Sequence, residues 1–147
     1  MTNDVIVTVK GVQIGLESED DIEVISPGKY YERNEKLFIR YEEQQEDMTG
    51  TIINIIKIGP EGVEIIKKGL IGAQMVFREK ESINTCYETP YGMMMVTIYT
   101  DRVQYTVNEE LIEVNLSYKI EMNGEMLSDA QVYIKVVPRT NEGISLV

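Results

Sequence analysis

Arg40 is the charged residue whose neighbours most suggest ligand chemistry. In the run Phe38-Ile39-Arg40-Tyr41-Glu42 it shares one face of an extended strand with Phe38 and Glu42, because successive strand side chains alternate. Inside a barrel, the arginine needs a carboxylate partner: Glu42, another acidic residue, or the head group of a bound amphipathic molecule. On an outer face, Arg40 and Glu42 form an ordinary exposed salt bridge. The sequence leaves both interpretations open.

Two tyrosines flank a tight turn. Thr89-Pro90-Tyr91-Gly92 fits a turn, because proline sets its own backbone angle at the second position and glycine eases the exit into the next strand. The functional alternative places Tyr87 and Tyr91 at the mouth of a barrel, where rings with hydroxyl tips contact an amphipathic ligand. The turn role is favoured over ligand contact.

A run of three methionines, Met93 to Met95, could line an adaptable apolar cavity together with Met75 and Phe77. Consecutive strand residues face opposite ways, however, so the three cannot all point inward. Ordinary packing of a filled barrel core is therefore favoured over a ligand cavity.

The residue types argue against catalysis. The 147-residue chain has no histidine, which excludes Ser-His-acid and Cys-His catalysis and the usual imidazole zinc sites. The single cysteine, Cys86, has no basic residue within four positions to activate it, and it cannot form an intramolecular disulfide. We expect no enzymatic activity, no cofactor and no metal, and a cysteine that simply packs in a strand.

The charge is strongly negative, at a formal −11, which disfavours nucleic-acid backbones and anionic membranes as partners. The acidic residues concentrate between Glu17 and Asp47. Their spacing does not match a calcium loop, so solvated loops that guard strand edges are favoured. The alternative is a surface that docks to a basic protein partner.

The stretch from Leu111 to Val137 positions these side chains most clearly. Apolar residues alternate with polar ones at positions 112, 114, 116, 118, 120 and 122, and residues 130 to 136 repeat this alternation. Asn123-Gly124 lies between the two segments, where the chain must turn. A two-residue loop would set the apolar face of the first strand against polar residues. We therefore predict a three-residue loop with a left-handed Gly124, which pairs Ile120 with Met126 and Leu116 with Ala130.

The same alternation recurs along the chain and predicts about ten strands in an up-and-down antiparallel barrel. Turns are expected at Ser26-Pro27-Gly28 and at Asp101-Arg102. The remaining candidate strands are Asp4 to Ile14, Asp21 to Ile25, Tyr30 to Glu43, Thr51 to Ile58, Val63 to Lys68, Ala73 to Phe77, Ser82 to Tyr87, Tyr91 to Thr100 and Val103 to Val107.

The length suits one domain, over residues 1–138, followed by a flexible tail over 139–147. No apolar run approaches the roughly 20 residues of a membrane span, and the N-terminal residues do not have the pattern of a secretion signal. With its one cysteine, the chain is expected in the cytoplasm.

Several segments together resemble the YwiB-like proteins, a bacterial family of unknown function whose fold is similar to the calycin barrels of lipocalins and fatty-acid-binding proteins. The segments are Phe38 to Glu43, Met75 to Phe77, Thr85 to Gly92 and Leu116 to Tyr118. The resemblance implies a calycin-like barrel of eight to ten strands in a bacterial cytoplasm, and no reaction. By analogy with fatty-acid-binding calycins, it makes Arg40, Arg78 and Tyr118 candidates for holding a ligand head group.

Two functions remain open. The first is a small binding protein whose interior or mouth accepts an apolar or amphipathic molecule, with Arg40, Arg78, Tyr87, Tyr91 and Tyr118 as candidate contacts. The second is a non-enzymatic interaction or structural protein with a filled core, which forms a homodimer or docks to a basic partner.

Overall fold

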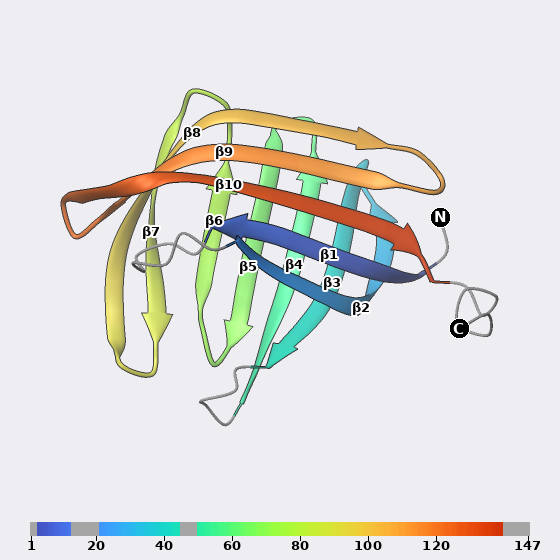
Figure 1. Ribbon diagram of the computed structural model, residues 1–147, viewed down its shortest axis with the longest axis horizontal. Helices are drawn as coiled ribbons and strands as arrows, with labels where there is room; N and C mark the ends of the chain where they lie inside the picture. The colour runs from blue at the N-terminus through green and yellow to red at the C-terminus, as the bar shows by residue number, and fades with distance from the viewer. Residues whose placement is uncertain (1–2, 13–20, 45–49, 140–147) are drawn as a thin grey trace.

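The computed structural model describes residues 3–12, 21–44 and 50–139, and within these it contains β-strands and no helix (Figure 1). The all-β prediction is confirmed. The strands are β1 (Asp4–Val12), β2 (Asp21–Arg33), β3 (Lys36–Gln44), β4 (Thr51–Gly59), β5 (Gly62–Gly69), β6 (Ala73–Phe77), β7 (Ser82–Thr89), β8 (Gly92–Val107), β9 (Ile112–Met122) and β10 (Glu125–Pro138). The acidic stretch 17–20, residues 45–47 and the expected tail from residue 140 lie outside the described residues.

Each strand pairs with its neighbour in the chain except at β6 and β7, and β1 also pairs antiparallel with β10, which joins the two ends of the chain. The ring of strands almost closes between β6 and β7. There the backbone of Gly72 exchanges hydrogen bonds of 3.0 and 2.8 Å with that of Glu88, and Thr85 Oγ1 donates to the Gln74 carbonyl at 2.7 Å. The result is the up-and-down antiparallel barrel expected from the sequence, with a narrow seam between β6 and β7.

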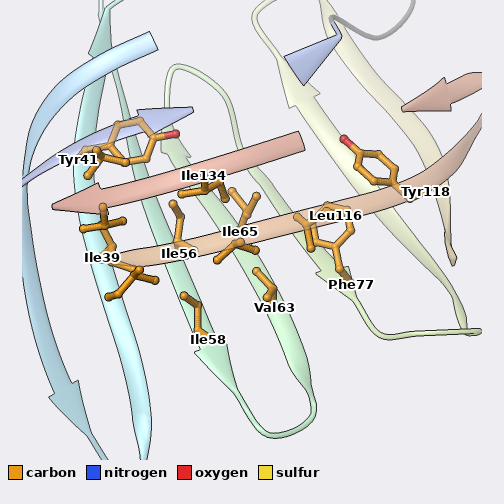
Figure 2. Close-up of a cluster of buried hydrophobic side chains, with 14 of the residues drawn as sticks. Ile39, Tyr41, Ile56, Ile58, Val63, Ile65, Phe77, Leu116, Tyr118 and Ile134 are labelled. Atoms are coloured by element: carbon orange, nitrogen blue, oxygen red, sulfur yellow. The ribbon is translucent and has the colours of Figure 1, made fainter. Parts of the chain in front are cut away.

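The inner face of the barrel is packed with branched aliphatic side chains (Figure 2). In β4 every second residue is buried, and Ile56 and Ile58 contact a core that also contains Phe77. The predicted inward face of β9 is confirmed: its buried residues are Ile112, Val114, Leu116, Tyr118 and Ile120. Alternation along the strands therefore identified the core correctly.

The hairpin that joins β9 and β10 has a two-residue turn, so the predicted three-residue loop is wrong. Asn123 and Gly124 have φ angles of 49° and 87°, the left-handed pair required by a type I′ turn. Met122 lies opposite Glu125, and a bulge between Met126 and Ser128 then shifts the register by one residue. Apolar pairs such as Leu116 with Val132 result, because the extra residue lies within β10 rather than in the turn.

The β2–β3 region also differs from the prediction. β2 does not end at Ser26-Pro27-Gly28: Pro27 lies opposite Ile6 of β1, and the strand continues to Arg33. Gly28 is required here, because a Cβ would lie only 2.8 Å from the Arg40 carbonyl oxygen. The chain instead reverses at Asn34-Glu35, with φ of 52° and 66°, so the predicted single strand from Tyr30 to Glu43 is two strands.

β8 is one strand of 16 residues, and the turn predicted at Asp101-Arg102 is a bulge between Thr100 and Arg102. A bulge bends its strand, and β8, β9 and β10 arch over the remaining strands (Figure 1). Beyond the bulge, the Tyr105 hydroxyl donates a 3.1 Å hydrogen bond to the Gly59 carbonyl at the β4–β5 turn. The far half of β8 is thus tied to the β4–β5 turn.

Candidate functional site

Both candidate arginines lie outside the barrel. Arg40 alternates with the buried Ile39 and Tyr41, and its guanidinium lies 3.5 Å from a carboxylate oxygen of Glu42. Arg78 follows β6 and lies 3.5 Å from Glu61 on the surface. The exposed salt bridge is therefore the correct interpretation of Arg40, and neither arginine can orient a ligand inside.

The turn that carries Tyr91 also faces outward. Tyr91 is 85% exposed, and its amide donates to Thr89 Oγ1 at 3.1 Å, which supports the structural role of this turn. Met93 and Met95 are exposed on the outer face, whereas Met94 lies on the opposite face of β8. The run of methionines therefore does not line an internal cavity.

Tyr87 and Tyr118 do face the interior. Tyr118 is buried, and its ring packs against Phe77 with centroids 4.9 Å apart. Tyr87 is half-buried against the same core. The two hydroxyls lie near enough that ionisation of Tyr87 would raise the pKa of Tyr118. Of the five residues predicted from the sequence, the structure brings these two together.

A buried polar group completes this part of the interior, and the sequence analysis did not identify it. Asn54 is fully buried, and it lies opposite both Tyr41 of β3 and Lys67 of β5. Lys67 Nζ donates a 2.7 Å hydrogen bond to Asn54 Oδ1, and Asn54 Nδ2 donates a 3.1 Å bond to Glu43 Oε1. Lys67 Nζ lies 3.7 Å from the same Glu43 oxygen, which closes a triangle of hydrogen bonds and charge.

Burial controls the protonation of this group. Burial lowers the pKa of Lys67, and the nearby Glu43 carboxylate partly opposes that shift. Burial raises the pKa of both Tyr41 and Tyr87, and the Glu43 charge raises both further. The Glu43 charge acts on tyrosines of β3 and β7, so the hydrogen-bonded triangle lies near Tyr41 and Tyr87.

Thr100 adds an unusual feature. It lies directly opposite Tyr118 across β8 and β9, it is 4% exposed, and its Oγ1 has no hydrogen-bond partner among the described residues. A buried hydroxyl without a partner is rare, because burial without a hydrogen bond costs roughly 1–3 kcal/mol. This oxygen therefore has an unused capacity to bind a polar group.

We call this set of inward residues the polar wall: Tyr41, Glu43, Asn54, Lys67, Tyr87, Thr100 and Tyr118. Figure 2 shows Tyr41 and Tyr118 on opposite sides of the apolar core, with their hydroxyls turned toward one another. One signal in the sequence indicated the wall: Asn54 is in phase with Ile52, Ile56 and Ile58 on a strand whose inner face is otherwise apolar. Its contacts with Lys67 and Glu43 depend on the registers of three strands.

A cleft of about 760 Å³ lies beside the polar wall, where the β8 bulge meets β7, β9 and β10. Thr100 and Tyr118 border this cleft, together with outward residues such as Ser117 and Lys119. Charges of both signs line it, and Lys80 pairs there with Asp101 at 2.9 Å. Its volume falls within the range of small-molecule sites.

Two kinds of feature were not found in the described parts of the chain. No cluster of three or more histidine, cysteine, aspartate or glutamate side chains is arranged to hold a metal ion. No helix there is long and apolar enough to cross a bilayer.

Comparison with known proteins identifies a family and a fold. The family model described as "Domain of unknown function (DUF1934)" matches residues 7–134. The crystal structure of the ywiB protein from Bacillus subtilis is similar, with a TM-score of 0.80 and 22% identity over 94% of this chain and 93% of that one. No curated protein matches. The resemblance to the YwiB-like proteins is confirmed, and at this identity the structural match concerns the fold alone.

Proposed function

Because this chain belongs to the family of the domain of unknown function DUF1934, we propose its function from the geometry of the polar wall. The protein is a small binding protein whose barrel takes up an amphipathic molecule, with the polar group of that molecule at Thr100 and Tyr118. The observation that carries this proposal is the Thr100 Oγ1, which is buried without a partner among the described residues, beside an equally buried tyrosine. A buried polar atom of this kind needs an explanation, and a ligand supplies one.

The surroundings of the polar wall suit such a molecule. Phe77, Leu116 and Ile120 offer apolar contacts beside Tyr118, and the adjoining cleft of about 760 Å³ is large enough for a small ligand. The likeness to calycin barrels supports the same mode of binding, in which an apolar interior carries a few polar groups. We propose binding rather than catalysis, because the inward charged groups Lys67 and Glu43 are already engaged, each by a hydrogen bond with Asn54.

Composition supports the setting of this function. A net charge of −11 disfavours nucleic acid and anionic membranes, and Cys86 is a free thiol, as expected in a reducing compartment. We therefore propose a bacterial cytoplasmic protein that works on a small molecule without a cofactor.

Native mass spectrometry tests the binding proposal. Protein purified from a bacterial host is compared under gentle ionisation and after denaturation. We expect a reproducible adduct of a few hundred daltons that is released on unfolding. The Tyr118→Phe variant, which removes one hydroxyl of the wall, should carry less adduct, whereas the Tyr133→Phe variant, which changes a tyrosine that bonds to Glu113 away from the cleft, should match the wild type. A clean mass without adduct in both states, together with no uptake of an added apolar dye, would contradict the proposal.

A second function is favoured by a different surface. Tyr91, Met93 and Met95 are all exposed on the β7–β8 hairpin, and large apolar side chains of this kind often mark contacts between proteins. The second candidate is therefore an interaction protein that forms a homodimer or docks to a basic partner. Sedimentation velocity tests it: a dimer that Met93→Ser and Met95→Ser dissociate would favour this function, and a monomer at all concentrations would exclude the homodimer.

A further inference from the structure

The charges of the polar wall determine what kind of head group it accepts. Lys67 is the one basic side chain that the described strands turn toward the interior, and its partners are Asn54 and Glu43. The arginines that could have received a carboxylate, Arg40 and Arg78, pair with Glu42 and Glu61 on the outside. The described inner face therefore offers a bound anion no unpaired cation.

The groups left for a ligand are neutral hydroxyls. Thr100 Oγ1 has no hydrogen-bond partner in the described part of the chain, and burial rather than a hydrogen bond to a carboxylate raises the pKa of Tyr118. By contrast, the outward Tyr99 and Tyr133 owe their raised pKa first to hydrogen bonds with Glu121 and Glu113. The inward hydroxyls thus stay protonated at neutral pH, and each can donate to a carbonyl or hydroxyl oxygen.

A carboxylate would be poorly accommodated here. Its charge would leave water for an apolar interior without a cation to balance it, and Glu43 already places a negative charge near Tyr87. An alcohol, ester or ketone oxygen carries no such cost, because it needs only the hydrogen bonds that the wall leaves unused.

We infer that the group of the ligand that reaches the polar wall is an uncharged oxygen function, and that Thr100 and Tyr118 recognise it. This inference rests on the proposed binding function and names its substrate class: neutral amphipathic molecules with an alcohol, ester or carbonyl group, rather than fatty acids. The fatty-acid head group expected by analogy with other calycins would need an inward arginine that the described structure does not have.

Dye displacement tests the inference. The neutral dye Nile red is bound to the full chain at a slightly alkaline pH and is displaced by 1-decanol or by decanoate, which have equal chain lengths. We expect half-displacement by decanol at a concentration at least about tenfold below that of decanoate, because the acid must bury an unpaired charge.

Variants assign the recognition to Thr100. Thr100→Val keeps the shape of the side chain and should weaken the binding of decanol about fivefold to tenfold, because one hydrogen bond is lost. Thr97→Val is the matched control, because Thr97 lies on the same strand but faces outward and donates to Asn84 at 2.7 Å. Thr97→Val should leave the affinity for decanol unchanged.

The outcomes separate the two proposals. Decanoate binding as well as or better than decanol, or an unchanged decanol affinity in Thr100→Val, overturns the inference while binding itself stands. If Nile red does not bind the wild-type protein, or neither compound displaces it, the binding function fails and the inference fails with it.

Discussion

Lys67 and Asn54 lie opposite each other across β5 and β4, and the lysine Nζ donates a 2.7 Å hydrogen bond to the asparagine Oδ1 inside the barrel. A largely buried lysine on the inner wall of a β-barrel is uncommon, because desolvation disfavours its charged form. Here Asn54 also bridges to Glu43, so one neutral amide satisfies both charges. The arrangement keeps a polar group in the interior with no net charge of its own.

Removing the lysine should destabilise the protein. Lys67→Met leaves Glu43 and the Asn54 oxygen without their buried donor, and we expect a loss of about 2 kcal/mol in the free energy of unfolding. Urea unfolding measures it. The neighbouring Lys68→Met changes an exposed side chain and should alter stability by less than about 0.5 kcal/mol. Equal effects of the two variants would contradict the role given to Lys67.

Thr100→Val should change the free energy of unfolding in the opposite direction and stabilise the ligand-free protein. The valine removes a buried hydroxyl that has no partner in the described structure, so the ligand-free protein should gain about 1 kcal/mol in unfolding free energy. The control Thr97→Val loses an exposed 2.7 Å hydrogen bond to Asn84 and should not stabilise the protein. A destabilised Thr100→Val, measured in urea on protein freed of ligand, would show that the hydroxyl is satisfied in solution.

Arg40→Ala should have almost no effect on stability or on dye binding. The ion pair with Glu42 spans 3.5 Å at an exposed site, and such pairs contribute little, so unfolding free energy should change by less than about 0.5 kcal/mol. Nile red affinity should also be unchanged, because the side chain faces away from the interior. Weaker dye binding in Arg40→Ala, with stability intact, would instead indicate that the outer face of β3 takes part in binding.

The buried tyrosines should make the protein sensitive to alkali. Burial raises the pKa of Tyr118 above its usual 10.0, so above about pH 10 the unfolded chain binds fewer protons than the folded one and stability falls as pH rises. Between about pH 9 and about pH 11, Tyr118→Phe should lose less unfolding free energy than the wild type. Lys67, with its lowered pKa, contributes the opposite slope in both proteins, so it cancels in the comparison. Parallel pH profiles would contradict the buried state of this hydroxyl.

Much of the fold could be predicted because inner and outer faces follow directly from alternation. The inward residues of β9 were placed correctly, whereas the sequence left open which face of Phe38 to Glu42 is buried. The errors lie where backbone conformation departs from common turn signals. Asn34-Glu35 reverses the chain without glycine or proline, while Pro27-Gly28 and Asp101 lie within continuous strands. Local residue preferences cannot distinguish a bulge from a turn, because the difference depends on which strand lies alongside.

The site could be predicted only in part, for a related reason. Tyr118 was a candidate by analogy with fatty-acid-binding calycins, on a strand of clear periodicity, and Tyr87 was a candidate because it lies next to a recognisable turn. The Asn54–Lys67–Glu43 group depends on two strand registers, and a shift of one residue in either would send a polar side chain outside. The sequence left both faces open for Arg40, and it is the burial of its neighbours Ile39 and Tyr41 that places Arg40 on the outer face.

The pairing of β1 with β10 has a consequence for how the chain folds. The other named ladders join strands that follow one another, so they can form by short, local searches, whereas this ladder must bring together segments from the two ends of the molecule. Closing a loop of that length costs on the order of 4 kcal/mol in chain entropy. We therefore expect ring closure, including the hydrogen bond from the Arg139 amide to the Asp4 carbonyl, to be the slow and late event, after the polar residues on β3, β4 and β5 have met.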